Sequence, residues 1–589
     1  MACQESTHIG ILSLDDKRYQ GQLQLHFERN GAEASDAGRR SLACASRRVV
    51  SFYFVPAVRS LKGCVMDRLT DWLFSKFQMG VMIWVDNGKL HYRNPPGALG
   101  SDDIIMLREM KQDIITVLTE RQSDFRASPE LQHRTGSDVA PLTLQQEWYF
   151  SHLNDYKGPA TTLTPASVPI ALRLLGSLDV GALGKSLNMM LRRHESLRTR
   201  MAVVGATPLQ RIDRANERQL PVIDCNGNSL DGIEERARGA VKEFFSKPLD
   251  LMTGPTLDLR LMRLGDSDHV MALLWDHFIM DRTSVVLFFQ ELWTLYADIR
   301  LGRPLSNQQE PTQYADYAVW QRKRYPLWLR EQSDYWRATL AGSALLQIPM
   351  DSGLSDMEPE TGGVVQFSLD RALKNSLLDL AKLHRSSPGM IMLSVLSILA
   401  LRLCNQRDFL IPLDVSGRRY PEDSDVIGLF SGPLLLRIQL SGSETFVETL
   451  KSVSNVFLTA NEHLDYAQNL IKGAAFRGSM VRWYPWAFNL DMSARPPEDQ
   501  QAVCPIAAPF AVEPEKSADS VATFKWPEPN KWNLALYNMP ESIDGALFYR
   551  ADLFKRATVE RIVRSLQSIA EQVVVNPHAR LFSLSCCAT

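Results

Sequence analysis

Several features that mark common classes of protein are missing from this sequence. The eight cysteines form no CxxC pair and no other metal-binding spacing, which predicts reduced thiols and no bound metal. Lys and Arg number 65 against 67 for Asp and Glu, and the formal net charge of −2 gives no sign of a nucleic-acid partner. No basic segment followed by an apolar one opens the chain, so we predict no signal peptide. The longest apolar run, Met390 to Cys404, is shorter than the roughly 20 residues of a membrane span. These absences predict a cytoplasmic protein that binds neither membrane nor nucleic acid.

What is present indicates a globular protein of mixed α/β fold. A length of 589 residues exceeds one ordinary domain and predicts two to four. Hydrophobic residues make up 45% and charged residues 22%, which is typical of a globular chain. Residues 394–404 predict a helix, whereas 409–415 and 434–440 predict strands.

The stretch WDHFIMDR at 275–282 carries the strongest chemical signal. The apolar run 270–275 before it predicts a buried strand. After it, apolar residues recur on one face of a predicted helix, at Val285, Phe289, Leu292, Trp293 and Tyr296. Three side chains could cap that helix, Asp281, Thr283 or Ser284. His277 and Asp281 therefore lie four residues apart in a strand-to-helix turn, where α/β proteins expose reactive groups, and of the 11 histidines only His277 has Asp at that distance.

The N-terminal part divides into an extension without pattern and a compact unit. Residues 1–65 are rich in Ser, Ala, Arg and Gln with little periodicity, so we predict that they are mostly disordered. From Met66 the pattern predicts a short helix and then a β-hairpin of 81–85 and 89–93 around an Asp-Asn-Gly turn. A second amphipathic helix follows the hairpin.

This unit, on the phrase GVMIWVDNGKLHYRNPPGALGSDDIIMLREMKQDIITVL, resembles the TubC-type N-terminal docking domain of peptide and hybrid peptide–polyketide assembly lines. The resemblance covers 66–121 and implies that Met66 is the natural start and that residues 1–65 are an extension or follow from a misplaced start codon. It also implies that this hairpin receives the C-terminal tail of an upstream synthase or synthetase. Strand addition would satisfy the edge backbone groups of the hairpin. The predicted docking side chains are Trp84, Lys89, His91, Tyr92 and Arg93.

A second resemblance covers the rest of the chain. Residues 122–140 are polar and predict a linker. Ordered motifs follow, namely PLTLQQEW at 141–148, LRRHESLRTR at 191–200, WDHFIMDR at 275–282, YADYAVWQR at 314–322, IGLFSGPLLLR at 427–437 and YPWAFNLDM at 484–492. The set resembles the condensation domain of nonribosomal peptide synthetases over about 141–583. Neither an adenylation motif nor a Gly-Gly-x-Ser carrier site appears, which predicts a stand-alone, trans-acting condensation protein.

The condensation resemblance implies a fold and a reaction. Two chloramphenicol-acetyltransferase-like lobes, 141–310 and 311–583, should meet in a V around a tunnel with His277 at its middle. Donor and acceptor carrier proteins are the implied partners, with substrates presented on their phosphopantetheine arms and no cofactor bound by this chain. The acceptor amine attacks the donor thioester to give an amide, or an alcohol gives an ester.

The family's HHxxxDG motif assigns roles to particular residues. Its second His matches His277, which could take the proton from the attacking amine or orient it and stabilise the tetrahedral species. Its Asp matches Asp281, whose implied part is structural, as the partner of an arginine. Arg418 is the candidate partner.

Three positions depart from the family pattern. Asp276 replaces the first His, and an anion beside His277 could raise the pKa of the imidazole. Arg282 replaces the final Gly and could fill the space for an acceptor arm, recognise a carboxylate, or pair with Asp276. Ser-Gly-Pro at 431–433 stands where Val-Asn-Thr is common.

Other residues that look reactive are predicted to be structural. His194, Glu195 and Arg198 should set the packing of the lobe at a helix end, and His463 should be structural too. Tryptophans eight residues apart predict a stripe of helical core, at Trp320, Trp328 and Trp336.

Three functions remain open from the sequence. The first is the trans-acting condensation enzyme, and the second is an acyltransferase that uses His277 on a free amine, alcohol or CoA thioester. The third is a catalytically silent module that recruits partners, which the changes at Asp276 and Arg282 would favour.

Overall fold

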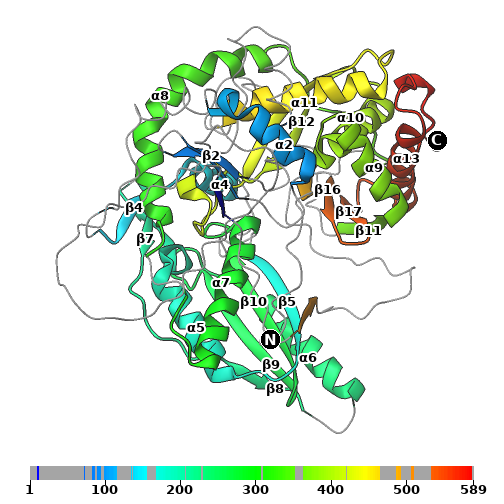
Figure 1. Cartoon of the computed structure of the whole chain (residues 1–589). Coiled ribbons are helices and arrows are strands. Elements are labelled where there is room, and N and C mark those ends of the chain that lie inside the picture. Colours follow the sequence, from blue (N-terminus) through cyan, green and yellow to red (C-terminus); the bar gives the residue numbers. More distant parts are fainter. Residues whose placement is uncertain are drawn as a thin grey trace, which may run out of the picture.

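The computed structural model describes most of the chain from residue 137 onward and shorter segments before it (Figure 1). The described residues are 9–11, 72, 82–86, 89–93, 99–115, 134, 137–155, 167–205, 207–226, 230–247, 249–306, 310–351, 362–419, 421–464, 486–491, 506–509 and 532–586.

The first lobe is built on a sheet in which β10 is central. The strand order is β15 (Ile506–Pro509), β5 (Ser167–Leu175), β10 (Asp268–Asp276), β9 (Leu257–Gly265) and β8 (Val222–Asp224). Residues 271, 273 and 275 of β10 share a core with α5 (Val180–Arg193) and α7 (Arg282–Leu301). Residues 270, 272 and 274 share a second core with α6 (Leu230–Phe245) on the other face. Because successive side chains of a strand point to opposite faces, burial on both sides explains the continuous apolar run.

The second lobe contains a six-stranded mixed sheet. Its order is β11 (Gly362–Leu369), β17 (Ile543–Arg550), β16 (Trp532–Asn538), β14 (Trp486–Asp491), β12 (Asp408–Val415) and β13 (Gly432–Gln439). Its helices are α9 (Arg371–Leu383), α10 (Pro388–Cys404), α11 (Phe446–Glu462) and α13 (Arg556–Val575). The longest apolar run is α10, which is buried along almost its whole length and begins at the Ser387 cap. The helix and the two strands predicted over 394–440 are confirmed.

No single helix among these described segments is long and apolar enough to cross a membrane, although α9 and α10 reach that composition together across a 104° bend.

Smaller elements complete this part of the chain. A three-stranded sheet orders β4 (Val139–Pro141), β7 (Thr207–Ile212) and β6 (Thr199–Val204). Helix α4 (Leu144–Asp155) and short 3₁₀ helices also belong to this part of the chain, namely η1 (Glu195–Arg198), η2 (Pro421–Asp423) and η3 (Leu581–Ser583).

Helix α8 (Tyr314–Leu340) and strand β15 are among the described segments that connect the lobes. Helix α8 runs from one to the other in Figure 1. Trp320 and Trp328 are buried in the core of the first lobe, and Trp336 is buried in the core of the second. The predicted tryptophan core stripe is therefore confirmed, but it serves two cores. In addition, β15 lies after residue 310 in the chain yet pairs with β5 in the first sheet.

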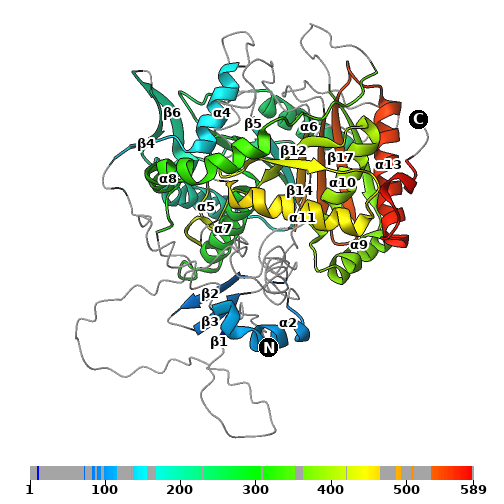
Figure 2. The ribbon, with the colours of Figure 1, turned by 90° about the horizontal axis from the view of Figure 1, so that it is seen from above.

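The N-terminal unit contains the predicted hairpin and helix, which lie together in Figure 2. Strands β2 (Met82–Asp86) and β3 (Lys89–Arg93) pair as a hairpin, and α2 (Ser101–Glu109) follows. Strand β1 (Ile9–Ile11) pairs with β3 on its other side, so β3 is the middle strand. Within residues 1–65, which are predicted to be mostly disordered, the structure describes only this strand, and the rest of the segment lies outside the described residues.

Candidate active site

The turn after β10 presents His277 to the site. Its ring is half-buried, and its Nδ1 lies 3.0 Å from the carbonyl oxygen of Met280. A carbonyl oxygen can only accept, so Nδ1 carries the hydrogen and donates it. In the neutral ring, Nε2 therefore keeps the lone pair. The turn thus selects the tautomer in which Nε2 can accept a proton.

Asp276, the last residue of β10, is fully buried beside His277. Its Oδ1 accepts hydrogen bonds from the Tyr149 hydroxyl at 3.0 Å and from the Phe278 amide at 2.9 Å, whereas Oδ2 has no partner. Burial raises the pKa of Asp276 to about 6, against the opposing effects of Phe278, Tyr149 and His277. Asp276 makes no hydrogen bond to Arg282, so the proposed pairing of these two residues is wrong.

Asp281 fixes the end of the turn and the start of α7. Its Oδ1 accepts from the Ser284 amide at 2.8 Å, which selects Asp281 from the three predicted caps. Its Oδ2 accepts from Arg418 Nη1 at 2.7 Å and from the amides of Phe430 and Ser431 at 3.0 and 3.1 Å. Burial alone would raise the pKa of Asp281, but the Arg418 charge and these hydrogen bonds outweigh it and hold the pKa below its usual value.

The arginine candidate from the sequence is thus placed directly against Asp281. Arg418 is buried, donates from Nη2 to the Ser284 hydroxyl at 2.8 Å, and stacks 4.3 Å from the Phe430 ring centre. The preceding Gly417 has φ of +68°, and a Cβ there would lie 2.0 Å from the Phe430 carbonyl oxygen. Only glycine suits that backbone and that approach, so Gly417 brings Arg418 close to the 428–431 segment.

The Ser-Gly-Pro segment takes part through its backbone. The Ser431 amide bonds Asp281, and the strand that starts at Gly432 pairs with β12. Because the donor is a backbone amide, which every residue except proline carries, Ser431 at this position keeps the anchor intact.

Arg282 reaches from the first lobe to the second. It is the first residue of α7 and is exposed, and its guanidinium carbon lies 4.6 Å from the ring centre of Tyr537 on β16. The sequence could not indicate Tyr537, because nothing local links β16 to this turn. A tunnel between the lobes stays a prediction.

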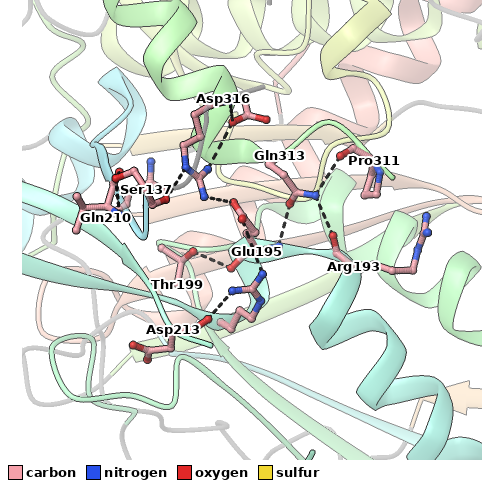
Figure 3. A network of polar contacts seen from close by, with 12 residues as sticks. Ser137, Arg193, Glu195, Thr199, Gln210, Asp213, Pro311, Gln313 and Asp316 are labelled. Carbon is pink, nitrogen blue, oxygen red and sulfur yellow. Dashed lines mark hydrogen bonds and ion pairs between the residues drawn. The ribbon is translucent and has the colours of Figure 1, made fainter. Parts of the chain in front are cut away.

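The residues predicted to be structural make contacts within the fold. His194 Nε2 lies 2.7 Å from Glu291 Oε2, and His463 donates from Nδ1 to the Thr459 carbonyl at 2.8 Å. Arg134 forms ion pairs with Glu195 and with Asp316 at the start of α8. Glu195 and Asp316 are labelled in Figure 3. Arg134 lies within the predicted linker, so that segment is anchored at this residue, a contact that its polar composition could not indicate.

The docking side chains cannot be placed. The backbone of both hairpin strands is described, but the side chains of Trp84, Lys89, His91, Tyr92 and Arg93 lie outside the described residues. Within the described part of the chain, no group of three or more His, Cys, Asp or Glu is arranged to hold a metal ion.

This site and fold belong to a known class of protein domain. The family model of the condensation domain matches residues 137–588, so the chain belongs to the condensation-domain family. The model of the TubC N-terminal docking domain matches residues 77–120. Both family resemblances drawn from the motifs are confirmed.

Similar proteins include components of large synthetases. A linear gramicidin synthase protein of Brevibacillus parabrevis is 31% identical over 460 residues, which is 74% of this chain and 8% of that protein. Chondramide synthase of Chondromyces crocatus is 28% identical over 77% of this chain and 11% of that protein. The chain thus spans a small fraction of the curated relatives it matches.

Solved structures show the same fold. The X-domain in complex with OxyB from teicoplanin biosynthesis has a TM-score of 0.63 at 24% identity, over 78% of this chain and 99% of that one. SgcC5 from Streptomyces globisporus has a TM-score of 0.62 at 22% identity, over 75% of this chain and all of that one.

Proposed function

We propose that this protein is a trans-acting condensation enzyme of a nonribosomal peptide or hybrid peptide–polyketide assembly line. It joins a carrier-bound acyl thioester to an amine, or to an alcohol as an ester. The observation that carries the proposal is the Nδ1 hydrogen bond of His277 to Met280, which leaves Nε2 as a proton acceptor. The docking-domain match supports action on substrates held by other chains.

The residues suggest how the reaction proceeds. His277 Nε2 takes a proton from the acceptor amine while the nitrogen attacks the thioester carbonyl. The C–N bond forms, the C–S bond breaks, and the proton ends on the departing thiolate of the donor arm. Thioester aminolysis is intrinsically easy, so holding both arms together supplies much of the acceleration.

Reconstitution tests this function directly. The full chain is mixed with a loaded donor carrier and a loaded acceptor carrier, and the tethered product is followed by mass spectrometry. A product of joined mass that depends on this protein is expected. Product from a free amine or alcohol without the acceptor carrier would instead support the acyltransferase alternative.

A recruiting module is the second candidate, and Arg282 is the observation that favours it. Its stacking on Tyr537 puts a guanidinium where the family has glycine. In addition, a protein of the same fold, the X-domain from teicoplanin biosynthesis, is bound to OxyB in its solved structure. Carrier binding without product in the reconstitution would support this candidate.

Replacing Arg282 by glycine should raise the condensation rate. If the stacked guanidinium narrows the path of the acceptor, the acceptor must break the contact between Arg282 and Tyr537 before it can react. A surface cation–π contact is worth about 0.5–1 kcal/mol, so its removal should raise the rate roughly two- to fivefold. The kcat and KM are measured with several acceptors, and Arg282→Lys is the control that keeps the charge. A lower rate confined to acceptors that bear a carboxylate would show recognition instead, and an unchanged rate would contradict both ideas.

Charge reversal in the docking strand should abolish partner binding. The sequence alternates Lys89, His91 and Arg93 with apolar residues on β3, which suggests a basic face and an acidic tail on the upstream partner. Calorimetry with that tail should show binding that weakens with salt, because exposed charges are screened over roughly 8–10 Å. Lys89→Glu combined with Arg93→Glu should lose it, and a tail of reversed charge should restore part of it. Equal binding by the double variant would contradict this assignment.

Because β3 is the middle strand of its sheet, the binding experiment needs one further variant. Because β1 already pairs with β3, strand addition there requires residues 9–11 to leave. A chain that begins at Met66 should therefore bind the acidic tail more tightly than the full chain. If it binds equally, the tail uses β2 or another surface.

A further inference from the structure

Tyr149 on α4 contacts the whole start of the catalytic turn. Its hydroxyl donates to Asp276 Oδ1 at 3.0 Å. Its ring lies edge-to-face with the His277 ring, with centroids 6.1 Å apart, and 6.4 Å from the Phe278 ring. Tyr149 is buried, so these contacts are made inside the protein and away from solvent. The Tyr149 side chain therefore contacts three consecutive residues, Asp276, His277 and Phe278.

Asp276 transmits that contact to the backbone of the turn. Its carboxylate accepts the Phe278 amide at 2.9 Å, and its carbonyl accepts the Ile279 amide at 3.1 Å. Its own amide donates to Thr256 at 2.9 Å. The orientation of His277 thus depends on a carboxylate that is held on one side by the turn and on the other by Tyr149.

We propose that Tyr149 is a positioning residue for His277, which it orients through the Asp276 carboxylate and by its own ring contact. This pair lets an aspartate serve at the position where the family motif has its first histidine. The proposal rests on the function proposed above, and it assigns Tyr149 an action through Asp276 and His277.

The arrangement predicts a pH dependence. Burial raises the pKa of Asp276 to about 6, and the Phe278 amide, the Tyr149 hydroxyl and His277 oppose that rise. Tyr149 from α4 and His277 from the turn are the titratable groups that act on Asp276, since its neighbours across the sheet, Ser167 and Thr256, do not titrate. Loss of the Tyr149 hydroxyl should therefore move the Asp276 titration to higher pH.

Tyr149→Phe tests the positioning role in two ways. We expect kcat to fall about tenfold with KM for both carriers unchanged, because a hydrogen bond to a charged group is lost away from the substrates. The acid limb of the rate profile should shift to higher pH, which a role in folding alone would not produce. Tyr335→Phe is the matched control, since that tyrosine stacks on His463, 3.9 Å between centroids, outside the site.

A measurement without substrate separates this proposal from the proposed function. Histidine-labelled protein is titrated by NMR, and the His277 signal is assigned with His277→Ala. In the parent protein the His277 shift should carry an inflection from Asp276 near pH 6, which moves upward in Tyr149→Phe and is absent in Asp276→Asn. Identical curves for the parent and both variants would overturn the positioning role even if condensation is observed. If the parent forms no product but the inflection moves as expected, the proposed function fails and the positioning role stands. If Tyr149→Phe fails to fold, Asp276→Asn still tests the carboxylate through which Tyr149 is proposed to act, and a His277 curve unchanged in that variant would overturn the proposal.

Discussion

Replacing His277 by alanine should lower the condensation rate by about 100-fold or more, because general base catalysis contributes on that order. In the turn, Nδ1 donates its hydrogen bond to the Met280 carbonyl, so Nε2 is the proposed proton acceptor that the substitution removes. Binding of both carriers should be unchanged, since the variant removes a proton acceptor and not a docking surface. Single-turnover measurement of the tethered product separates the chemical step from binding.

His463→Ala is the matched control for this experiment. That histidine also donates from Nδ1 to a backbone carbonyl, at 2.8 Å to Thr459, but it lies at the end of α11. It should keep the condensation rate of the parent. A folded His277→Ala protein that forms product at the parent rate would end the assignment of His277 as base or orienting group.

Replacing Arg418 by alanine should destabilise the fold by about 3–5 kcal/mol, because one charge of a buried pair is then left without its partner. The exposed fractions are 3% for Arg418 and 1% for Asp281, so water cannot compensate. Denaturant unfolding measures the loss. The proposed activity should fall as well, because Asp281 then loses the arginine that helps to hold it at the end of the turn that carries His277.

A second ion pair of the same chain provides the control. Arg337 and Asp334 pair at 2.6 Å with exposed fractions of 70% and 83%. Arg337→Ala should therefore cost only about 0–1 kcal/mol. Equal losses for the two variants would contradict the view that burial makes the Arg418 pair decisive.

The stability that the Arg418–Asp281 ion pair contributes should decrease as the pH falls. The pKa of Asp281 is held below its usual value in the folded protein, so the stability it contributes is present above that usual value. It is lost as the pH falls through the lower, folded pKa. Asp281→Asn should therefore flatten the acid side of the stability curve, which thermal unfolding from neutral to acidic pH can check.

The sequence by itself determined the local elements and the family. The two-sided apolar run of β10, the helix after it and the Asp-Asn-Gly hairpin are local patterns, because strand and helix periodicities repeat within a few residues. The buried helix α10 was predictable for the same reason. The order of motifs was enough to identify both domains.

Only the tertiary structure decided the contacts that complete the site. The sequence places Asp276 beside His277, but it could not show that the carboxylate is buried against Tyr149 rather than paired with Arg282. Nor could it place Tyr537 under Arg282, or β15 in the first sheet. These partners lie far apart in the chain, and their meeting depends on how two sheets and α8 pack. The hydrophobic periodicity of a sequence shows which face of a helix or strand is apolar, but it does not show which distant element covers that face.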